Sequence, residues 1–401
     1  MVASTTRQTL FIEPLDVLFL RGNKLFGDPG SFGESLVPPW PSVAAGAIRS
    51  ALLAHKGVDL RRFARGEIDD AELGKPTQPG SFRIIDFRLA RRFVDGRIRI
   101  EPLYLPPADL VIRHKSDAGL ECARMEPRAL RSGLHSSAPT ELHAVLPERE
   151  RTKPESGYWL TADGWQAYLA GRNLDPQRHL VMSGDLWRLD ARVGVGLDPT
   201  KRSAAEGKLF TVQAVAMRNR HHGHGCDYDV GFLAEIEGAA VPPELMLRFG
   251  GDGRAARASL ISFLPSEPDL AEHIAETRRC RLILTSPGLF PGGWLPTGTA
   301  AHGAGDIHFE LHGVRARLVC AAVPRAEVIS GWDLAAWTQR KGGPKPAQRV
   351  APTGSVYWLD QLEATAEQLR ELVTYGLWTD PPHDPARRAE GLNRFTLGSW
   401  P

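Results

Sequence analysis

Two basic side chains precede a glycine-rich turn near the start of the chain, in an arrangement that could hold a phosphate. Arg21 and Lys24 follow an apolar run, three glycines come next, and PPWPSVAAGAIRSALL starts a predicted helix near Ser42. A helix N-terminus offers unpaired backbone N–H groups that favour anions, and Arg49 lies further along the same helix. The stretch therefore predicts an anion-binding connection. The alternative is an ordinary strand–loop–helix connection, and the spacing is not that of a P-loop.

A second segment, RAEVISGWDLAAWTQRKGGPKPAQRVAPTGSVYW, mixes basic and aromatic residues. Four of its cations fall within ten residues of a Gly/Pro-rich stretch, Arg340, Lys341, Lys345 and Arg349. Such a mixture suits single-stranded nucleic acid, because cations neutralise the backbone while bases stack on aromatic rings. The alternative is a solvated basic loop above buried tryptophans. We expect Trp332 to be buried, so its replacement by alanine would cost ~3–5 kcal/mol of stability.

Two glycine-containing segments are further candidates for a binding surface. In SPGLFPGGWLP, Gly292 and Gly293 precede Trp294 and could expose backbone amides to a ligand, or could simply form a tight turn. The segment RVGVGLDPTKRSAAEGKLF predicts a β-hairpin that extends from the body of the protein, or an exposed turn. The basic residues of interest in it are Arg192, Lys201 and Arg202.

Metal and catalytic chemistry find little support in the sequence. The run HHGHGC contains four possible zinc ligands, His221, His222, His224 and Cys226. A short glycine-spaced run rarely converges on one ion, so we favour a polar linker and expect no metal or cofactor. A metal-independent endoribonuclease would need a general base beside the 2′-hydroxyl, usually histidine. His55, His114 and His302 have no evident partner in the sequence, so we expect no enzymatic activity.

The elements that must position these residues predict an α+β protein. The first predicted strand is Leu10 to Phe19, in which Pro14 suggests an edge position or a bulge. The clearest helix is EATAEQLRELVTYGLW, where Thr365 and Gln368 form a capping-box pair and Gly376 suits the C-terminal cap. A strand–helix start and a strand–helix–strand finish favour two ferredoxin-like (RRM-like) βαββαβ domains with glycine-rich loops and insertions.

Length and composition set the wider frame. A chain of 401 residues predicts two domains, which we place at 1–220 and 221–401, with insertions at about 61–188 on the first. The net charge of +2 argues against one large basic face, so phosphate contacts must come from local clusters. No apolar run approaches the length of a membrane span or a secretory signal, and the four cysteines are far apart. We therefore expect a cytoplasmic protein without membrane partners.

Taken together and in this order, the segments resemble the RAMP proteins that form the third subunit of the type III-B CRISPR effector module, the Cmr complex. The matching stretches are EPLDVLFLRGNKLFG, PPWPSVAAGAIRSALL, RVGVGLDPTKRSAAEGKLF, SPGLFPGGWLP, EVISGWDL, VAPTGSVYW and EGLNRFTLGSW. Residues 61–188 contribute little to this resemblance. The closing segment departs from the richer glycine loop of many RAMP proteins, which argues against a close approach of RNA at Asn393, although asparagine tolerates a left-handed backbone.

The resemblance implies two closely packed ferredoxin-like domains without nuclease activity. It implies that the protein holds the 5′ handle of the guide RNA and contacts the large polymerase-cyclase-like subunit and a backbone RAMP subunit. The handle site would include Arg21, Lys24 and the helix start from Ser42 to Arg49, and we expect alanine at Arg21, Lys24 and Arg49 to weaken handle binding without unfolding the protein. Gly292 to Trp294 would form an RNA-facing loop near ISGWDL and the basic segment ending at Arg349. The hairpin at Arg192 to Glu206 would wedge toward the guide or a neighbouring subunit.

Overall fold

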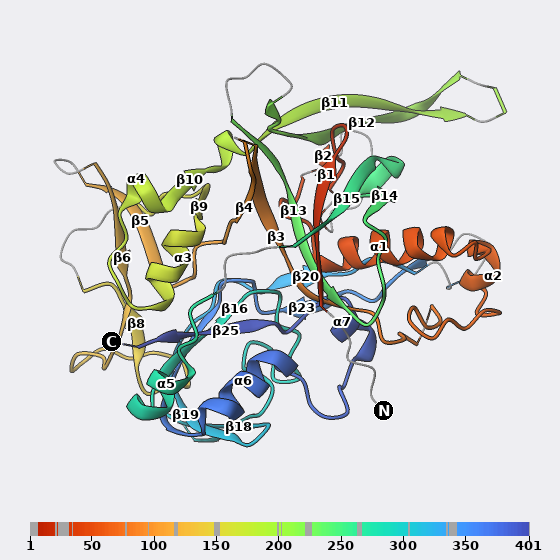
Figure 1. Ribbon diagram of the computed structural model, residues 1–401. Helices are drawn as coiled ribbons and strands as arrows, with labels where there is room; N and C mark the ends of the chain where they lie inside the picture. The colour runs from red at the N-terminus through yellow and green to blue at the C-terminus, as the bar shows by residue number, and fades with distance from the viewer. Residues whose placement is uncertain are drawn as a thin grey trace. The chain divides into compact units, whose positions relative to one another are not determined.

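The computed structural model forms two compact units, each assembled from three stretches of chain (Figure 1). The structure describes residues 7–20, 22, 32–33, 35–76, 78–94, 96–115, 119–147, 153–198, 200–201, 203–220, 227–262, 267–303, 305–333, 336 and 343–400. Unit 1 comprises Met1–Pro102, Ser183–Leu264 and Ile329–Ala347, and unit 2 comprises Leu103–Met182, Pro265–Val328 and Gln348–Pro401. The boundary predicted at residue 220 therefore falls inside unit 1 rather than between the units.

Unit 1 is built on a six-stranded antiparallel sheet. Its order is β14 (Glu244–Arg248), β15 (Ala255–Ile261), β1 (Gln8–Pro14), β13 (Tyr228–Glu237), β3 (Arg83–Val94) and β4 (Ile98–Pro102). The predicted edge position of Pro14 is wrong, because β1 lies between two partners. Proline is tolerated there because the pairing of β1 with β13 ends at Ile12, so that Pro14 is paired with β15 alone.

One helix packs on this sheet and a second follows it. Helix α1 (Pro41–His55) contacts β14 and β3, and its buried side is made of small and branched residues such as Ala44, Ile48 and Leu52. Helix α2 (Leu60–Ala64) is capped by Asp59, whose carboxylate accepts hydrogen bonds from two backbone N–H groups. The predicted helix start near Ser42 is thus confirmed to within one residue.

A long β-hairpin also belongs to unit 1. Strands β11 (Trp187–Asp198) and β12 (Ser203–Met217) pair antiparallel over most of their length, and β2 (Phe32–Gly33) adds to β12 in parallel. Figure 1 shows the turn end of this hairpin running out beyond the sheet of unit 1. The predicted β-hairpin is confirmed.

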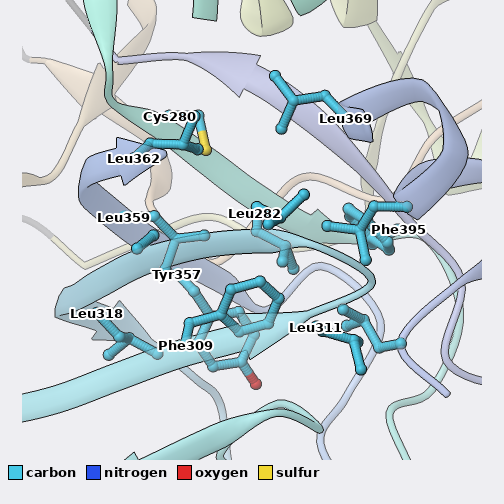
Figure 2. Close-up of a cluster of buried hydrophobic side chains, with 14 of the residues drawn as sticks. Cys280, Leu282, Phe309, Leu311, Leu318, Tyr357, Leu359, Leu362, Leu369 and Phe395 are labelled. Atoms are coloured by element: carbon cyan, nitrogen blue, oxygen red, sulfur yellow. The ribbon is translucent and has the colours of Figure 1, made fainter. Parts of the chain in front are cut away.

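The main sheet of unit 2 is also six-stranded and antiparallel. Its order is β17 (Thr299–Gly303), β18 (Asp306–Leu311), β19 (Val314–Ala322), β24 (Val356–Glu363), β16 (Cys280–Leu284) and β25 (Phe395–Ser399). Helices α5 (Ala271–Thr277) and α6 (Ala366–Tyr375) contact each other and β25. Figure 2 shows Leu282, Leu359 and Phe395 gathered with Leu369 of α6 in one apolar cluster.

The opposite face of this sheet is buried as well. Alternate residues of its strands, including Ile283, Val319 and Trp358, pack in a second cluster with Trp165 and Tyr168 of α3 (Ala162–Leu169). The covering segment was predicted to be an insertion on the first domain, but residues 103–182 lie in unit 2. They do so because a strand that is buried on both faces, such as β16, needs a cover on each side.

The remaining elements of the described chain are short. Helices α4 (Pro176–His179) and α7 (Pro385–Ala389) belong to unit 2. The short strands are β5 (Leu110–Lys115), β6 (Gly119–Arg124), β7 (Glu126–Arg128), β8 (His143–Val145), β9 (Tyr158–Leu160), β10 (Leu180–Met182), β20 (Glu327–Ile329), β21 (Trp332–Asp333), β22 (Gly343–Pro344) and β23 (Gln348–Val350). None of the helices in these described ranges has the length and apolar character needed to cross a membrane.

Candidate nucleic-acid interface

The start of helix α1 provides only part of the predicted anion site. Arg21 and Lys24 lie outside the described residues, so the structure does not place them. Ser42 lies in the first turn, after the N-cap Trp40, and no side chain caps the helix. The guanidinium of Arg49 is used within the fold, because its Nη2 donates to the carbonyl oxygens of Leu73 at 2.7 Å and Lys75 at 3.3 Å. Arg49 therefore holds the loop that follows α2.

Replacing Arg49 by alanine is expected to lower stability by about 1–2 kcal/mol, because two partly buried carbonyl groups lose a charged donor. Thermal unfolding of the full chain measures this loss. The matched control is Arg62→Ala, since Arg62 is exposed and forms an ion pair with the exposed Glu67, and its loss is expected to cost no more than ~0.5 kcal/mol. Equal effects of the two variants would contradict the structural role of Arg49. The RNA test of this region should accordingly change only Arg21 and Lys24.

The hairpin presents two chemically different faces. Leu189, Val193 and Leu197 are exposed at 49%, 70% and 65% on one side of β11. On the other side lies Arg192, whose Nε donates to Asp190 at 2.9 Å. Gly194 also lies on that side, where an added Cβ would come within 2.4 Å of the ring of Phe210.

The turn of the hairpin carries the other predicted cations of this segment. Lys201 is exposed at the turn, where its backbone N–H donates to Asp198. Arg202 is outside the described residues. Lys201 therefore gives the turn one exposed cation, and the role of Arg202 stays a prediction.

The basic segment near the ISGWDL loop is only partly described. Arg340 and Lys341 lie outside the described residues. The backbone N–H of Lys345 donates to Gly331 at 2.8 Å, which ties this part of the segment to the loop. The expectation that Trp332 is buried is wrong: its side chain is 57% exposed. It lies on the two-residue strand β21, whose one partner among the described residues is β22. Its replacement therefore would not carry the cost of a buried ring.

The turn at Gly292 to Trp294 is the best-defined part of the predicted surface. Gly293 has φ of +77°, and its N–H donates to Phe290 at 3.1 Å. A Cβ at Gly293 would meet no atom within 4 Å, so this backbone is open to a ligand. The hydroxyl of Tyr357 donates to the carbonyl of Trp294 at 2.6 Å. Burial raises the pKa of Tyr357, which keeps the hydroxyl protonated as a donor.

This turn forms one wall of a cavity of about 430 Å³, which we call the Trp294 pocket. It is lined by Ala138, Thr140, Gly293, Trp294, Ala321, Val323, Pro324, Ala326, Arg349, Val350 and Ala351. Arg349 is exposed, and the described residues provide no carboxylate partner for it. The pocket thus combines an aromatic ring, an open stretch of backbone and one cation. These are the groups that bind the base and phosphate of a single-stranded nucleotide.

Backbone hydrogen bonds explain why residues almost sixty positions apart meet here. Gly288 and Ala351 exchange both N–H···O bonds at 2.8 Å, which places the loop before Gly292 beside the strand that carries Arg349. Asn393 secures the same loop from the other side. Its Oδ1 accepts from the N–H of Leu289 at 2.6 Å, and its Nδ2 donates to the carbonyls of Leu289 and Leu377. Asn393 is thus a buried residue whose side-chain hydrogen bonds hold in place the loop that leads into the pocket wall.

Some residues of the pocket carried no signal in the sequence. Thr140 and Ala138 belong to the region that was treated as an insertion, and Val323 and Pro324 have side chains without evident chemistry. Their place in the pocket follows from the packing of residues 103–182 in unit 2. A sequence pattern alone could not have indicated it, because apolar wall residues look like any other core residues.

The alternative sites predicted for metals and catalysis remain without support in the described chain. The run from His221 to Cys226 lies outside the described residues. Within the described ranges, no group of three or more His, Cys, Asp or Glu side chains could hold a metal ion. His55 and His114 lie at the ends of α1 and β5, and His302 on β17 lies 5.4 Å from the ring of His308.

Comparisons with known proteins were made for the whole chain. A family model described as CRISPR-associated protein (Cas_Cmr3) matches residues 10–400. One matching solved chain belongs to the "Cryo-EM structure of the Type III-B Cmr-beta bound to cognate target RNA", with 12% identity, a TM-score of 0.39, and coverage of 88% of this chain and 86% of that chain. The same complex with AMPPnP in state 1 gives 12% identity and a TM-score of 0.39, and covers 91% and 88%. No curated protein matches the sequence.

Proposed function

The chain belongs to the Cas_Cmr3 family of CRISPR-associated proteins, and from this premise we propose that it is a non-catalytic RNA-binding subunit of a type III-B CRISPR effector complex. In this role it holds the single-stranded 5′ handle of the guide RNA. The observation that carries the proposal is the Trp294 pocket, where Gly293, Trp294 and Arg349 meet around one cavity.

The chemistry of the pocket suits one splayed nucleotide. The ring of Trp294 offers a stacking surface, a contribution of about 1–3 kcal/mol per base. Arg349 at the rim supplies the cation for a phosphate, and the open backbone at Gly293 allows close approach. Arg21, Lys24 and the start of α1 contribute further handle contacts in this proposal, together with Lys345 and the neighbouring cations Arg340 and Lys341.

The hairpin of unit 1 is the proposed contact with the guide or a neighbouring subunit. Its exposed apolar residues, such as Val193 and Leu197, suit a protein surface, whereas Arg192, Lys201 and Arg202 suit RNA or an acidic partner. The proposed protein partners are the large polymerase-cyclase-like subunit and a backbone RAMP subunit. A cytoplasmic location follows from assembly with guide RNA.

We further assign both main sheets to the ferredoxin-like RAMP class. In unit 1, strands β15, β1, β13 and β3 lie side by side, and in unit 2 strands β25, β16, β24 and β19 do the same. Numbered along the chain, each set has the spatial order 4-1-3-2 of a βαββαβ unit. Each set also keeps one of the two connecting helices, α1 in unit 1 and α6 in unit 2. The strand order supports the assignment, and the missing helices are replaced by strands or loops.

The experiment that tests the handle site compares Arg349→Ala with wild-type protein in binding a handle oligonucleotide over a range of salt concentrations. We expect about tenfold weaker binding at low salt and a salt dependence reduced by a slope of about 0.7, the value for one lost phosphate contact on a single strand. Arg315→Ala is the matched control, because Arg315 is an exposed arginine of the same unit that is paired with Glu310. Unchanged affinity and slope for Arg349→Ala would reject this site.

The non-catalytic part of the proposal has its own test. Repeat RNA incubated with the purified protein in EDTA is expected to remain intact, because the described histidines have no arrangement suited to activating a 2′-hydroxyl. Gel analysis of end-labelled RNA measures this. Cleavage at one position that persists in independent preparations would favour a metal-independent endoribonuclease instead.

A further inference from the structure

A row of alternating charges crosses one end of the main sheet of unit 1. Glu13 of β1 lies opposite Arg257 of β15, and their side chains are 2.7 Å apart. Asp229 of β13 lies opposite Arg92 of β3, with 2.9 Å between Oδ2 and Nη2. Arg92 also reaches Glu13 at 2.8 Å, across the intervening strand. The row therefore joins four neighbouring strands through two carboxylates that are almost fully buried.

Gly231 leaves room for this row of charged side chains to cross the sheet. Gly231 is two residues from Asp229 on the same face of β13, and a Cβ there would come within 2.8 Å of the ring of Phe11. The ring can therefore lie over the strand, and the guanidinium carbon of Arg92 lies 4.9 Å from its centroid. The position of Arg92 is fixed from below by the ring and from both sides by carboxylates.

Two more arginines close a cavity of about 420 Å³ above this row, which we call the Arg218 pocket. Arg220 contacts Asp229 with its Nε and its backbone N–H, both at 3.2 Å. Arg218 contacts neither carboxylate: its Nη2 donates to the carbonyl of Gly184 at 3.0 Å, and its Nε is buried without a partner among the described atoms. The remaining acid of the lining, Asp16, is paired with Arg254.

The charges of the pocket are unbalanced. Four arginines line it, and three of them already form ion pairs with the two buried carboxylates, Glu13 and Asp229. Arg218 is the fourth. A purely structural network that ties the strands together would not require Arg218. The buried, unpartnered Nε of Arg218 is costly unless an anion accepts its hydrogen bond and neutralises the guanidinium. Guanidinium groups bind phosphate in a planar, often bidentate geometry.

We propose that the Arg218 pocket binds a phosphoryl group, as a phosphate monoester or diester. This site lies in unit 1 and is distinct from the Trp294 pocket of unit 2, so it goes beyond the proposed handle site. The source of the phosphoryl group is either a small phosphorylated molecule or the backbone of RNA, and the two are separated by experiment.

The test measures thermal unfolding and calorimetric binding of the full chain with inorganic phosphate, AMP and adenosine at constant ionic strength. Phosphate and AMP are expected to raise the melting temperature, because a ligand that binds the folded state stabilises it. Adenosine, which has no phosphate, is expected to give no effect that depends on Arg218. If neither phosphate nor AMP shifts the melting temperature, the proposal is overturned.

Variants tie the binding to the pocket. Arg218→Gln removes the charge but keeps a polar side chain, and it is expected to weaken AMP binding about tenfold, the effect of losing one charge-assisted contact. The matched control is Arg248→Gln on the exposed side of β14, which removes the same charge from the same sheet and should leave binding unchanged. Arg257→Gln provides a second variant if Arg218→Gln does not fold. Equal affinities in wild type, Arg218→Gln and Arg257→Gln would reject the site.

Competition by a short single-stranded RNA distinguishes the two possible sources of the phosphoryl group. If the RNA competes with AMP and binds Arg218→Gln more weakly, the phosphoryl group comes from the RNA backbone. If AMP binds but RNA neither competes nor distinguishes the variant, the pocket takes a small phosphorylated molecule. Arg315→Ala, which changes neither pocket, should leave AMP binding unchanged in both cases. AMP binding that persists in Arg218→Gln but is lost in Arg349→Ala would belong to the Trp294 pocket and would overturn this proposal, so its failure can be told apart from failure of the handle site.

Discussion

Replacing Asp109 by alanine is expected to destabilise the protein by about 3–5 kcal/mol, because it leaves a buried arginine without its partner. Asp109 is 1% exposed, and its Oδ2 accepts from Nη1 of Arg281 at 3.0 Å. Its Oδ1 accepts from the hydroxyl of Tyr168 at 2.6 Å. The other donors of Arg281 bind the backbone carbonyls of Ser399 and Tyr168. Among the described residues, Asp109 is therefore the one carboxylate that pairs with its charge.

The midpoint of urea unfolding, followed by tryptophan fluorescence, measures this loss. Asp163→Ala is the control, because Asp163 is paired with Arg178 and both side chains are more than half exposed. That exposed pair is expected to contribute no more than ~1 kcal/mol. A double variant, Asp109→Leu with Arg281→Met, should recover part of the stability because no charge remains buried. A loss in Asp109→Ala no greater than in the control would contradict this account.

Replacing Asn393 by alanine is expected to cost about 3 kcal/mol from two separate sources. The first is the loss of three side-chain hydrogen bonds to Leu289 and Leu377 in the interior of unit 2. The second is backbone strain, since Asn393 has φ of +59°, where alanine is disfavoured. The same urea midpoint reports the combined effect.

Asn393→Gly separates the two sources, because glycine adopts this conformation freely but also lacks the side chain. The glycine variant should be about 1 kcal/mol more stable than the alanine variant. Both should weaken handle binding if the loop behind the Trp294 pocket must be held in place. If the alanine variant is as stable as wild type, Asn393 does not secure this loop.

Local signals in the sequence were sufficient where a few neighbouring residues decide the structure. The capping box of Thr365 and Gln368 is present in α6, and Gly376 ends that helix with φ of +84°. The hairpin at β11 and β12 was also predicted from its own residues. These features depend on contacts within a few positions of the chain, which a sequence pattern records directly.

Features that depend on distant contacts were missed or misread. Nothing near Arg49 in the sequence indicates that its guanidinium binds the carbonyl of Leu73, and nothing near Trp332 shows that its ring is exposed. The convergence of Trp294 with Arg349 was expected only through the family resemblance. Its physical cause, the exchange of hydrogen bonds between Gly288 and Ala351, is visible only in the folded chain.

The order of strands in unit 1 has a practical consequence for anyone who divides this protein. Strand β1 pairs with β13 and β15, both of which follow residue 220. A fragment that stops there would leave the apolar β1 with two open edges and no neighbour, a template for aggregation rather than a domain. Truncation is therefore a poor route to isolating either half, and point substitutions in the intact polypeptide are the sounder tool.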